Sequence, residues 1–360
     1  MEKMYETRLK KVAGNLRAAR LAQTLVTAPA SVFYLTGCRV SPGERMLALL
    51  VRDDGSCVLY ANRLFALTGV AKVPLVEYDD TDDCVAILAS DLQPGEIGID
   101  KTWQSQFTIR LMGTGRDLRP VLGSQCVDDA RMVKGPDELE WMRVSSRLND
   151  QAIARTIESL REGMTEREVC ALYEQNAKAA GGTTMSFPPL ICFGANCAEP
   201  HHESDDTVLK RGDTVILDVG LMYRDYCSDM TRTVFFGEAG EEQRKVYEVV
   251  LAANEAGRRA VRPGVPMKEF DRAAREVIEE AGYGPYFTHR TGHGIGLEVH
   301  EFPDNSAVSE TVARPGMVFS VEPGVYLPGR FGVRVEDLIA VTEEGGETLN
   351  HLSREFRVVG

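Results

Sequence analysis

The chain contains VILDVG (residues 215–220), followed closely by YCSD (residues 226–229), two strand-like segments that each carry one acid. Acids in otherwise apolar strands are costly to bury unless positive charge lies among them. Asp218 and Asp229 are symmetric about the midpoint between residues 223 and 224. A hairpin in that register would oppose them directly, with Cβ atoms about 5 Å apart.

A second pair of acids lies near the end of the chain. SVEPG (residues 320–324) and VRVED (residues 333–337) supply Glu322 and Glu336, which are symmetric about Gly329. Residues 327–330 resemble a turn, so we expect a second hairpin with both acids on one face.

A histidine flanked by glycines, His293 in TGHGIG (residues 291–296), lies between the two acidic pairs in sequence. Four carboxylates balance two divalent cations, and mixed oxygen and nitrogen ligands suit Mn²⁺, Co²⁺ or Zn²⁺ better than Ca²⁺. Any one of these acids alone would more often be a turn or edge residue than a ligand. Together they predict a two-metal site, and such a site implies hydrolysis.

The composition excludes several classes of protein. The chain has 360 residues, enough for two domains, and its net charge of −13 argues against a nucleic-acid partner. No apolar run approaches membrane-spanning length, and the first residues lack the apolar core of a signal peptide, so we expect an amphipathic opening helix. The eight cysteines form no C-x-x-C pattern, which predicts reduced thiols in a cytoplasmic protein.

The first part of the chain, residues 1–132, is expected to be an α/β domain. Strands at 46–51 and 58–60 flank an Asp-Gly turn, and a helix is expected over 83–92. This part has no histidine and no compact acid cluster. We therefore expect it to shape or cover a site, or to dimerise, rather than to catalyse.

The second part, residues 133–360, predicts the same order of elements twice. Helices over 136–161 and from the capping box at 165–168 to the glycines at 181–182 precede the first hairpin. Helices over 241–261 and 267–281 precede the second. The fold class expected is α+β, a pseudo-twofold domain with metals at its centre.

The sequence resembles the pita-bread metallopeptidases. GHGIGLEVHE (residues 292–301) and EPGVY (residues 322–326) carry the resemblance, together with the order of the five ligands. SVFYLTG (residues 31–37) and residues 131–138 resemble the creatinase-type N-terminal domain and its connector. Within the family, the chain is most similar to Xaa-Pro aminopeptidase and to Xaa-Pro dipeptidase (prolidase), and the resemblance implies a homodimer.

The resemblance also implies a role for each ligand. Asp218 would bind one metal and His293 the other, while Asp229 and Glu336 would bridge the two. Glu322 would bind one metal and act as general base on the water between them. Mn²⁺ is the first choice of metal, with Co²⁺ and Zn²⁺ as alternatives.

Three further histidines match residues of the family's pocket. His201 would contact the substrate and move protons near the leaving proline nitrogen, and His300 would donate near the scissile carbonyl. His289 would line the proline-side pocket. For each of them a hydrogen-bonded structural role is the alternative; His202 and His351 are expected to be structural or at the surface.

Two more residues would contact the substrate or its ligands. Arg334 shares a strand face with Glu336 and would orient a ligand carboxylate, unless it forms a surface salt bridge. Tyr326 and residues 187–189 would wall an apolar pocket for a proline ring, unless they are core residues.

The length of the substrate depends on one departure from the family. Several prolidases carry a basic residue shortly after the VHE string, where it binds the free carboxylate of a dipeptide. This chain has Asp304 there, in HEFPD (residues 300–304). Provided that Asp304 lines the pocket, it would repel a carboxylate, which favours an Xaa-Pro aminopeptidase acting on longer peptides. Prolidase is the alternative, if an arginine from the N-terminal domain or a partner subunit supplies the charge.

Three other functions fit the sequence less well. A methionine aminopeptidase normally lacks such an N-terminal domain. A metal-free creatinase-like hydrolase should have lost ligand acids, and a non-catalytic binding module should have broken ligands. All five ligands are present here, so we expect peptides with proline at the second position to be the substrates.

Overall fold

A mixed sheet forms the centre of the N-terminal unit. The computed structural model describes residues 2–360, and the chain divides into two units, Met1–Arg131 and Met132–Gly360. The sheet of the first unit has the strand order β4-β3-β2-β1-β5-β6. Its elements are α1 (Glu2–Ala18), β1 (Gln23–Val26), α2 (Pro29–Thr36), β2 (Leu47–Arg52), β3 (Cys57–Asn62), η1 (Arg63–Phe65), β4 (Leu75–Tyr78), α3 (Cys84–Ser90), β5 (Gly95–Ile99), α4 (Ser105–Met112), β6 (Leu118–Leu122) and α5 (Gln125–Met132).

The predicted hairpin and helix of this unit are confirmed. β2 and β3 pair antiparallel around Gly55, which has a φ of 88° and donates its N–H to the Arg52 carbonyl. The predicted helix corresponds to α3. Apolar residues of the strands and helices form one buried core, so this part of the chain has a hydrophobic centre of its own.

The C-terminal unit begins with a long helix and alternates helix pairs with strands. Its helices are α6 (Pro136–Glu158), α7 (Glu166–Ala180), α8 (Glu241–Ala260), α9 (Lys268–Glu280) and the short η2 (Gly194–Ala198) and η3 (Gly284–Tyr286). Its strands are β7 (Thr184–Met185), β8 (Leu190–Phe193), β9 (Thr214–Val219), β10 (Leu221–Tyr223), β11 (Tyr226–Cys227), β12 (Met230–Phe236), β13 (Gly292–Gly294), β14 (Glu301–Asn305), β15 (Val318–Val321), β16 (Gly324–Leu327), β17 (Phe331–Arg334), β18 (Asp337–Val341), β19 (Gly346–Thr348) and β20 (Val358–Val359).

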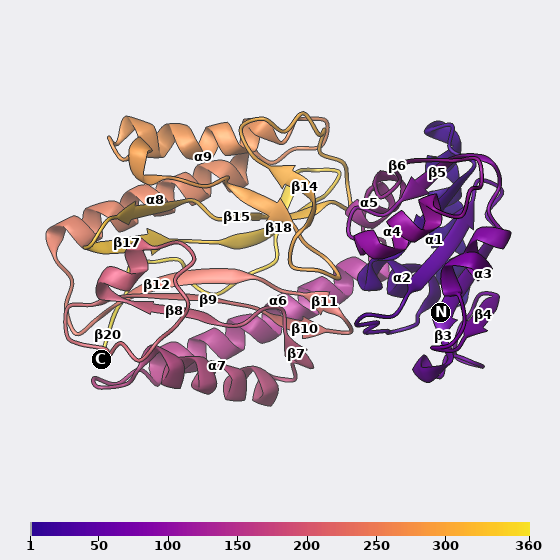
Figure 1. The fold of residues 1–360 in the computed structure, drawn as a ribbon. Helices are drawn as coiled ribbons and strands as arrows, with labels where there is room; N and C mark the ends of the chain where they lie inside the picture. Colours follow the sequence, from indigo (N-terminus) through magenta and orange to yellow (C-terminus); the bar gives the residue numbers. More distant parts are fainter. Residues whose placement is uncertain (1) are drawn as a thin grey trace. The chain divides into compact units, whose positions relative to one another are not determined.

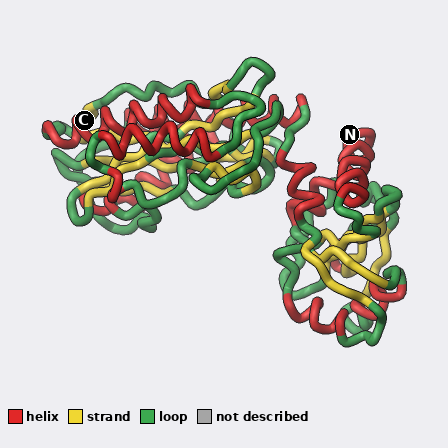
Figure 2. The backbone as a smooth tube through the Cα atoms, turned by 90° about the horizontal axis from the view of Figure 1, so that it is seen from above, coloured by secondary structure: helices red, strands yellow, loops and turns green. Residues whose placement is uncertain are grey.

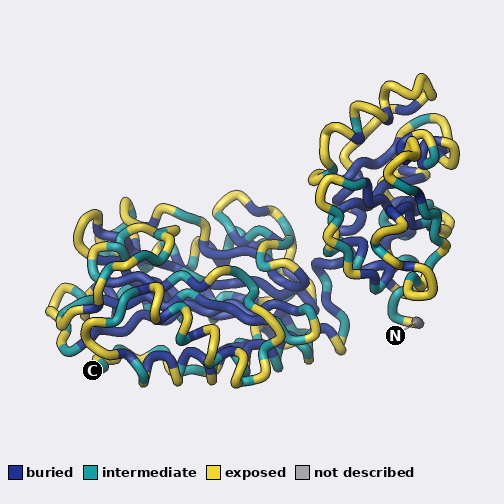
Figure 3. Tube along the Cα trace, turned by 60° about the horizontal axis from the view of Figure 1, so that its bottom comes forward, coloured by how far each residue is buried: buried dark blue, intermediate teal, exposed yellow. Residues whose placement is uncertain are grey.

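The two helix pairs cover opposite faces of the strands in this unit (Figure 1). α6 and α7 pack on the sheet β20-β12-β9-β8, and α8 and α9 pack on the strands that follow them, including β15, β16 and β17. Within this unit, Figure 2 shows helices lying over the strands, and Figure 3 shows the strands buried. The predicted repetition of helix, helix and strands is therefore present.

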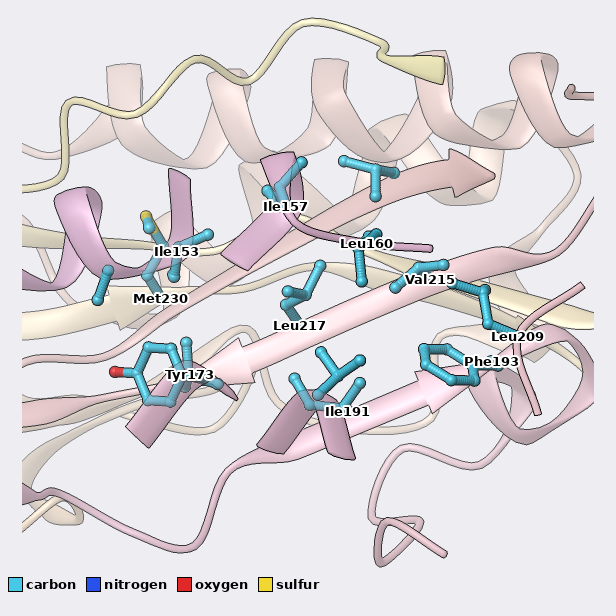
Figure 4. Packing of buried hydrophobic residues seen from close by; sticks show 14 of the residues in the cluster. Ile153, Ile157, Leu160, Tyr173, Ile191, Phe193, Leu209, Val215, Leu217 and Met230 are labelled. Atoms are coloured by element: carbon cyan, nitrogen blue, oxygen red, sulfur yellow. The ribbon is translucent and has the colours of Figure 1, made fainter. Parts of the chain in front are cut away.

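Figure 4 shows the hydrophobic core between the helices α6 and α7 and the sheet that they cover. Ile153 and Ile157 of α6 and Tyr173 of α7 are buried against the sheet. They meet Ile191 of β8 and Leu217 of β9. These strands are buried from both sides, which explains their continuous apolar sequence.

The predicted helix boundaries agree with the structure except at one end. The capping box at Thr165 and Glu168 starts α7, and Gly181, with a φ of 107°, ends it. α6 stops at Glu158, three residues before its predicted end at residue 161. The reason is that Leu160 turns into the core while the Gly163 N–H bonds the Leu209 carbonyl.

The predicted register of the first hairpin is wrong by two residues. Asp218 pairs with Thr231, not with Asp229. The turn is a two-residue loop at Arg224 and Asp225, which have φ values of 49° and 72°. Such a loop matches the twist of the strands but is usually marked by glycine or asparagine, which are absent here. Because the error is an even number of residues, Asp218 and Asp229 still lie on one face.

The predicted register of the second hairpin is confirmed. Gly324 pairs with Arg334 and Val321 with Asp337, so Glu322 lies across from Glu336 between these pairs. Gly329, with a φ of 69°, lies at the centre of the loop.

Two other expectations concern the chain as a whole. All eight cysteines are free. Among the described residues, no helix combines the length and apolarity that crossing a bilayer requires.

The C-terminal unit has two halves, the first helix pair with the strands up to β12 and the second helix pair with the strands that follow it. A buried ion pair joins a strand of one half to a strand of the other, and we expect it to be essential for stability. Arg232 of β12 is 2% exposed and donates to Asp337 of β18, which is fully buried, over 2.8 Å. The Asp337→Ala variant should lose about 3–5 kcal/mol of unfolding free energy, because it leaves the guanidinium buried without its carboxylate.

Urea unfolding of the metal-stripped protein at neutral pH measures this loss. The control is Asp206→Ala, which removes an exposed partner of Arg167 and should leave stability unchanged within error. Equal effects of the two substitutions would contradict the prediction.

Candidate metal centre

One cavity of about 260 Å³ in the C-terminal unit gathers the residues that the sequence singled out. All five predicted ligands line it, and so do four further predicted site residues: His201, His289, His300 and Arg334. Its complete lining is Phe187, Leu190, Pro200, His201, Asp218, Asp229, His289, Arg290, His293, Val299, His300, Glu322, Arg334 and Glu336.

The four acidic ligands lie at strand ends and at breaks between strands, whereas His293 is the middle residue of β13. Asp218 is on β9, and Asp229 directly precedes β12. Glu322 lies in the break between β15 and β16, and Glu336 in the break between β17 and β18. At these breaks the backbone leaves the ladder, which lets neighbouring side chains from both hairpins turn toward one cavity.

Three of the side chains approach one another closely. One ligand atom each of Asp229, His293 and Glu336 lies within 4.8 Å of the others. The His293 Nε2 atom is 3.7 Å from Asp229 Oδ2 and 3.3 Å from Glu322 Oε1. Among the described residues, the buried Asp229 Oδ1 atom has no hydrogen-bond partner. A buried carboxylate oxygen without a donor is the environment that a cation would complete.

The electrostatics of the cluster also fit a cation. Burial, followed by the neighbouring carboxylates, raises the pKa of Asp229 and of Glu336 well above the usual range. Burial lowers the pKa of His293 to about 4, so its imidazole is neutral. Its Nδ1 lies 3.1 Å from the Gly294 carbonyl, which can only accept, so Nδ1 carries the proton. The Nε2 lone pair therefore faces the acids, as in a metal-binding histidine.

Arg334 contacts one predicted ligand carboxylate directly and a second one through a threonine. Its Nη2 donates to Asp218 Oδ2, and its Nε donates to Thr231 Oγ1 over 3.1 Å. Thr231 in turn donates to Glu336 Oε2 over 2.7 Å. The shared strand face suggested direct contact with Glu336, but that contact passes through Thr231.

Tyr326 does not wall the cavity; its hydroxyl lies behind the lining. Arg334 Nη1 donates to this oxygen over 2.8 Å, and His289 Nε2 lies 2.8 Å from it. His289 Nδ1 lies 2.7 Å from the carbonyl of Arg290, so Nδ1 carries the proton. Burial lowers the pKa of His289, so in its neutral form Nε2 accepts the tyrosine proton. Both nitrogens of His289 are thus occupied, although its ring still lines the cavity. Of the other apolar residues expected there, Phe187 lines the cavity.

The other histidines differ in their contacts. The ring of His300 packs against that of His293 at 4.1 Å between centroids, and burial is the main cause that lowers its pKa to about 4. His202, expected to be structural, lies 2.9 Å from the buried carboxylate of Glu166. That carboxylate also accepts from backbone N–H groups of Phe193 and Asp205. The carboxylate thus has several partners within the protein, and these contacts tie down the loop that carries His201. His351 is exposed.

Sequence reasoning missed two equivalent asparagines. Asn149 of α6 donates to the Val219 carbonyl beside Asp218, over 2.9 Å. Asn254 of α8 donates to the carbonyls of Val321 and Val335, beside Glu322 and Glu336. Both side chains are fully buried. A polar residue on the apolar face of the first helix in each pair was the available signal.

Sequence reasoning also missed Arg290, and its assumption that Asp304 lines the pocket is wrong. Asp304 does not line the cavity; it accepts from Arg290 Nη1 over 2.7 Å, and Arg290 does line the cavity. The available signal was its position in the HRTGH string (residues 289–293), just before the histidine ligand.

Comparisons with known proteins agree with this geometry. Residues 140–343 match the model of metallopeptidase family M24, and residues 8–133 match the creatinase/prolidase N-terminal domain. An uncharacterised peptidase of Staphylococcus aureus strain MSSA476 is 37% identical over 359 residues, covering 97% of this chain and all of the relative.

Solved structures with the same fold cover nearly the whole chain. A dipeptidase from Pyrococcus horikoshii is 36% identical with a TM-score of 0.92, covering 98% of this chain and 100% of its own. A prolidase from Thermococcus sibiricus is 33% identical with a TM-score of 0.93, covering 99% of each chain. An X-Pro aminopeptidase from Thermotoga maritima is 31% identical with a TM-score of 0.82, covering 96% of this chain and 100% of its own. The chain therefore belongs to metallopeptidase family M24 and is a metallo-exopeptidase, in which a creatinase-type N-terminal domain is followed in sequence by a pita-bread domain.

Proposed function

We propose that the protein hydrolyses the bond between an N-terminal residue and a proline at the second position, at a centre of two divalent metal ions. The observation that carries this proposal is the cavity in which four carboxylates meet a neutral imidazole. The similar dipeptidase, prolidase and X-Pro aminopeptidase support the choice of bond.

The ligands would divide between two ions. Asp218 would hold one and His293 the other, while Asp229 and Glu336 would bridge them and Glu322 would complete the set. Mn²⁺ is our first choice, with Co²⁺ and Zn²⁺ as alternatives. When bound, such ions polarise the scissile carbonyl and lower the pKa of water, which gives a nucleophile near neutral pH.

The protein's own side chains would handle the protons. Glu322 would accept the proton of the attacking water; its Oε1 accepts from Ser320 Oγ over 2.9 Å, which orients the carboxylate. His300 is neutral near pH 7 and would donate a hydrogen bond near the scissile carbonyl. His201 lines the same cavity and would pass a proton toward the leaving proline nitrogen.

The expectation of longer substrates has lost its structural basis. It assumed that Asp304 faces the cavity, whereas Asp304 is paired with Arg290. Xaa-Pro aminopeptidase and Xaa-Pro dipeptidase activities are therefore both retained within this proposal. The homodimer, the cytoplasmic location and a non-catalytic domain over residues 1–132 stay predictions.

A hydrolysis panel tests the proposal. Metal-stripped protein receives Mn²⁺, Co²⁺ or Zn²⁺ and is offered Ala-Pro, Ala-Pro-Ala and, as a control, Met-Ala-Ala. We expect metal-dependent cleavage of proline substrates alone. Glu322→Gln should lower kcat by about 10²–10⁴-fold, because it removes the general base, whereas Glu343→Gln, at an exposed position, should change nothing.

Two results would contradict the proposal. Cleavage of Met-Ala-Ala alone would indicate a methionine aminopeptidase. No turnover of either proline substrate with any metal would indicate a metal-free hydrolase or a binding module.

Burying several acids side by side lowers the free energy of unfolding of the metal-free protein, and this effect gives a second test. Without metal at neutral pH, Asp229→Asn should be more stable than the unsubstituted protein by about 1–3 kcal/mol. Burial and the neighbouring acids raise the pKa of Asp229 in the folded state, which lowers stability at any pH above the pKa of the unfolded carboxyl, and asparagine has no such cost. Added Mn²⁺ should raise the melting temperature of the unsubstituted protein more than that of the variant, because the variant has lost a ligand.

Thermal unfolding with a chelator and with Mn²⁺ provides both comparisons. Asp206→Asn, at an exposed acid, should respond to Mn²⁺ as the unsubstituted protein does. If Asp229→Asn is the less stable protein in the chelator, Asp229 is not held at an electrostatic cost.

A further inference from the structure

Two histidines that are adjacent in sequence have different surroundings. His201 lines the cavity of the metal centre, whereas the ring of His202 contacts Glu166, with Nε2 at 2.9 Å from Oε2. The side chain of His202 is 14% exposed and that of Glu166 is fully buried. One short segment therefore brings a histidine to the cavity and anchors the next histidine inside the protein.

Glu166 accepts hydrogen bonds from both ends of this segment. It is the first residue of α7, where the backbone dipoles of a helix favour a negative charge. Its Oε1 accepts from the Phe193 N–H over 2.7 Å and from the Asn196 side chain over 3.0 Å. Its Oε2 accepts from the Asp205 N–H over 2.9 Å and from His202 Nε2. Each oxygen thus has two donors, so both lone pairs of each oxygen are used within the protein.

His201 is held in place by its two neighbours in sequence. It is exposed, so packing against its own side chain contributes little to its position. The preceding residue, Pro200, accepts through its carbonyl from Arg334 Nη1 over 3.4 Å. The following residue, His202, donates to Glu166. Fixing the backbone on both sides reduces the positions that the imidazole of His201 can take.

We propose that Glu166 and His202 are positioning residues for His201. They keep its imidazole at the place in the cavity from which it passes a proton to the leaving proline nitrogen. This inference rests on the proposed function, from which it takes that proton transfer. The transfer requires hydrogen-bond reach, so a shift of the imidazole by about 1 Å is enough to slow the reaction. In the described chain neither Glu166 nor His202 lines the cavity, so both act through His201.

His202 is the better of the two residues to substitute. Glu166→Ala would leave the buried N–H of Phe193 and the N–H of Asp205 without their acceptor, and is expected to impair folding. His202→Leu removes one of the four donors to Glu166 and keeps the other three. His202→Gln retains a side-chain N–H donor of similar reach and should therefore restore the contact.

The first test measures turnover of the proline substrate that the hydrolysis panel identifies. His202→Leu should lower kcat by about 10- to 100-fold, because the imidazole of His201 is no longer held at the leaving nitrogen, and His202→Gln should recover most of the loss. The rise in melting temperature on adding Mn²⁺ should be the same in both variants, since residues 193–205 contain no predicted metal ligand. His351→Leu, at an exposed histidine, should change neither quantity.

A double substitution separates positioning from a general structural effect. In protein that already carries His201→Ala, the imidazole to be positioned is absent, so adding His202→Leu should lower kcat by less than about 2-fold further. The same loss with and without His201 would overturn the proposal, because His202 would then act on the site by another route. An unchanged kcat in His202→Leu alone would also overturn it.

Amide hydrogen exchange of the metal-loaded protein gives a readout that is independent of turnover. The amides of residues 193–205 should exchange faster in His202→Leu, return to the original rate in His202→Gln, and leave those of α8 unchanged. If no proline substrate is cleaved but this local change is present, the proposed function fails while the anchoring of His201 by Glu166 stands. Unchanged exchange in His202→Leu would overturn the anchoring whatever the activity.

Discussion

The constraint on which the C-terminal unit depends is the burial of several carboxylates in one cavity. Asp229 and Glu336 are 3% and 1% exposed, and the buried Arg334 donates to a third acid of the cavity, Asp218. Such a cluster cannot form on one sheet alone, because each hairpin supplies only two acids. The two halves must therefore be held against each other more firmly than the acids repel.

Backbone and side-chain bonds beside the ligands provide that hold. Thr231 and Thr233 of β12 bond to Glu336 and to the backbone of Arg334, which belong to the other half. Buried asparagines on α6 and α8 fix the carbonyls next to three of the acids. Geometry set in this way before a metal arrives reduces the reorganisation that binding requires.

The sequence predicted the elements, the order of the halves and the residues of the cavity better than the contacts between them. The second hairpin could be predicted because a glycine lies at the centre of its loop. The register of the first hairpin was predicted wrongly because Arg224 and Asp225 adopt positive φ. Neither residue is a glycine, so the amino-acid types at the turn do not indicate its position. The partner of Arg334 could not be predicted, since strand alternation gives the face of a residue but not the neighbour across the halves.

Asp304 shows why the charge of a cavity cannot be deduced from one position. Its place after the VHE string suggested a negative pocket, yet its carboxylate is bound to Arg290, whose guanidinium lines the cavity. An acid that pairs with an arginine fixes positive charge there instead of excluding it. A basic residue at position 304 would present its charge directly; here Arg290 presents it from the adjacent strand segment. The sign of the charge beside the cavity therefore depends on a contact across the β13–β14 pair, which one sequence position does not give.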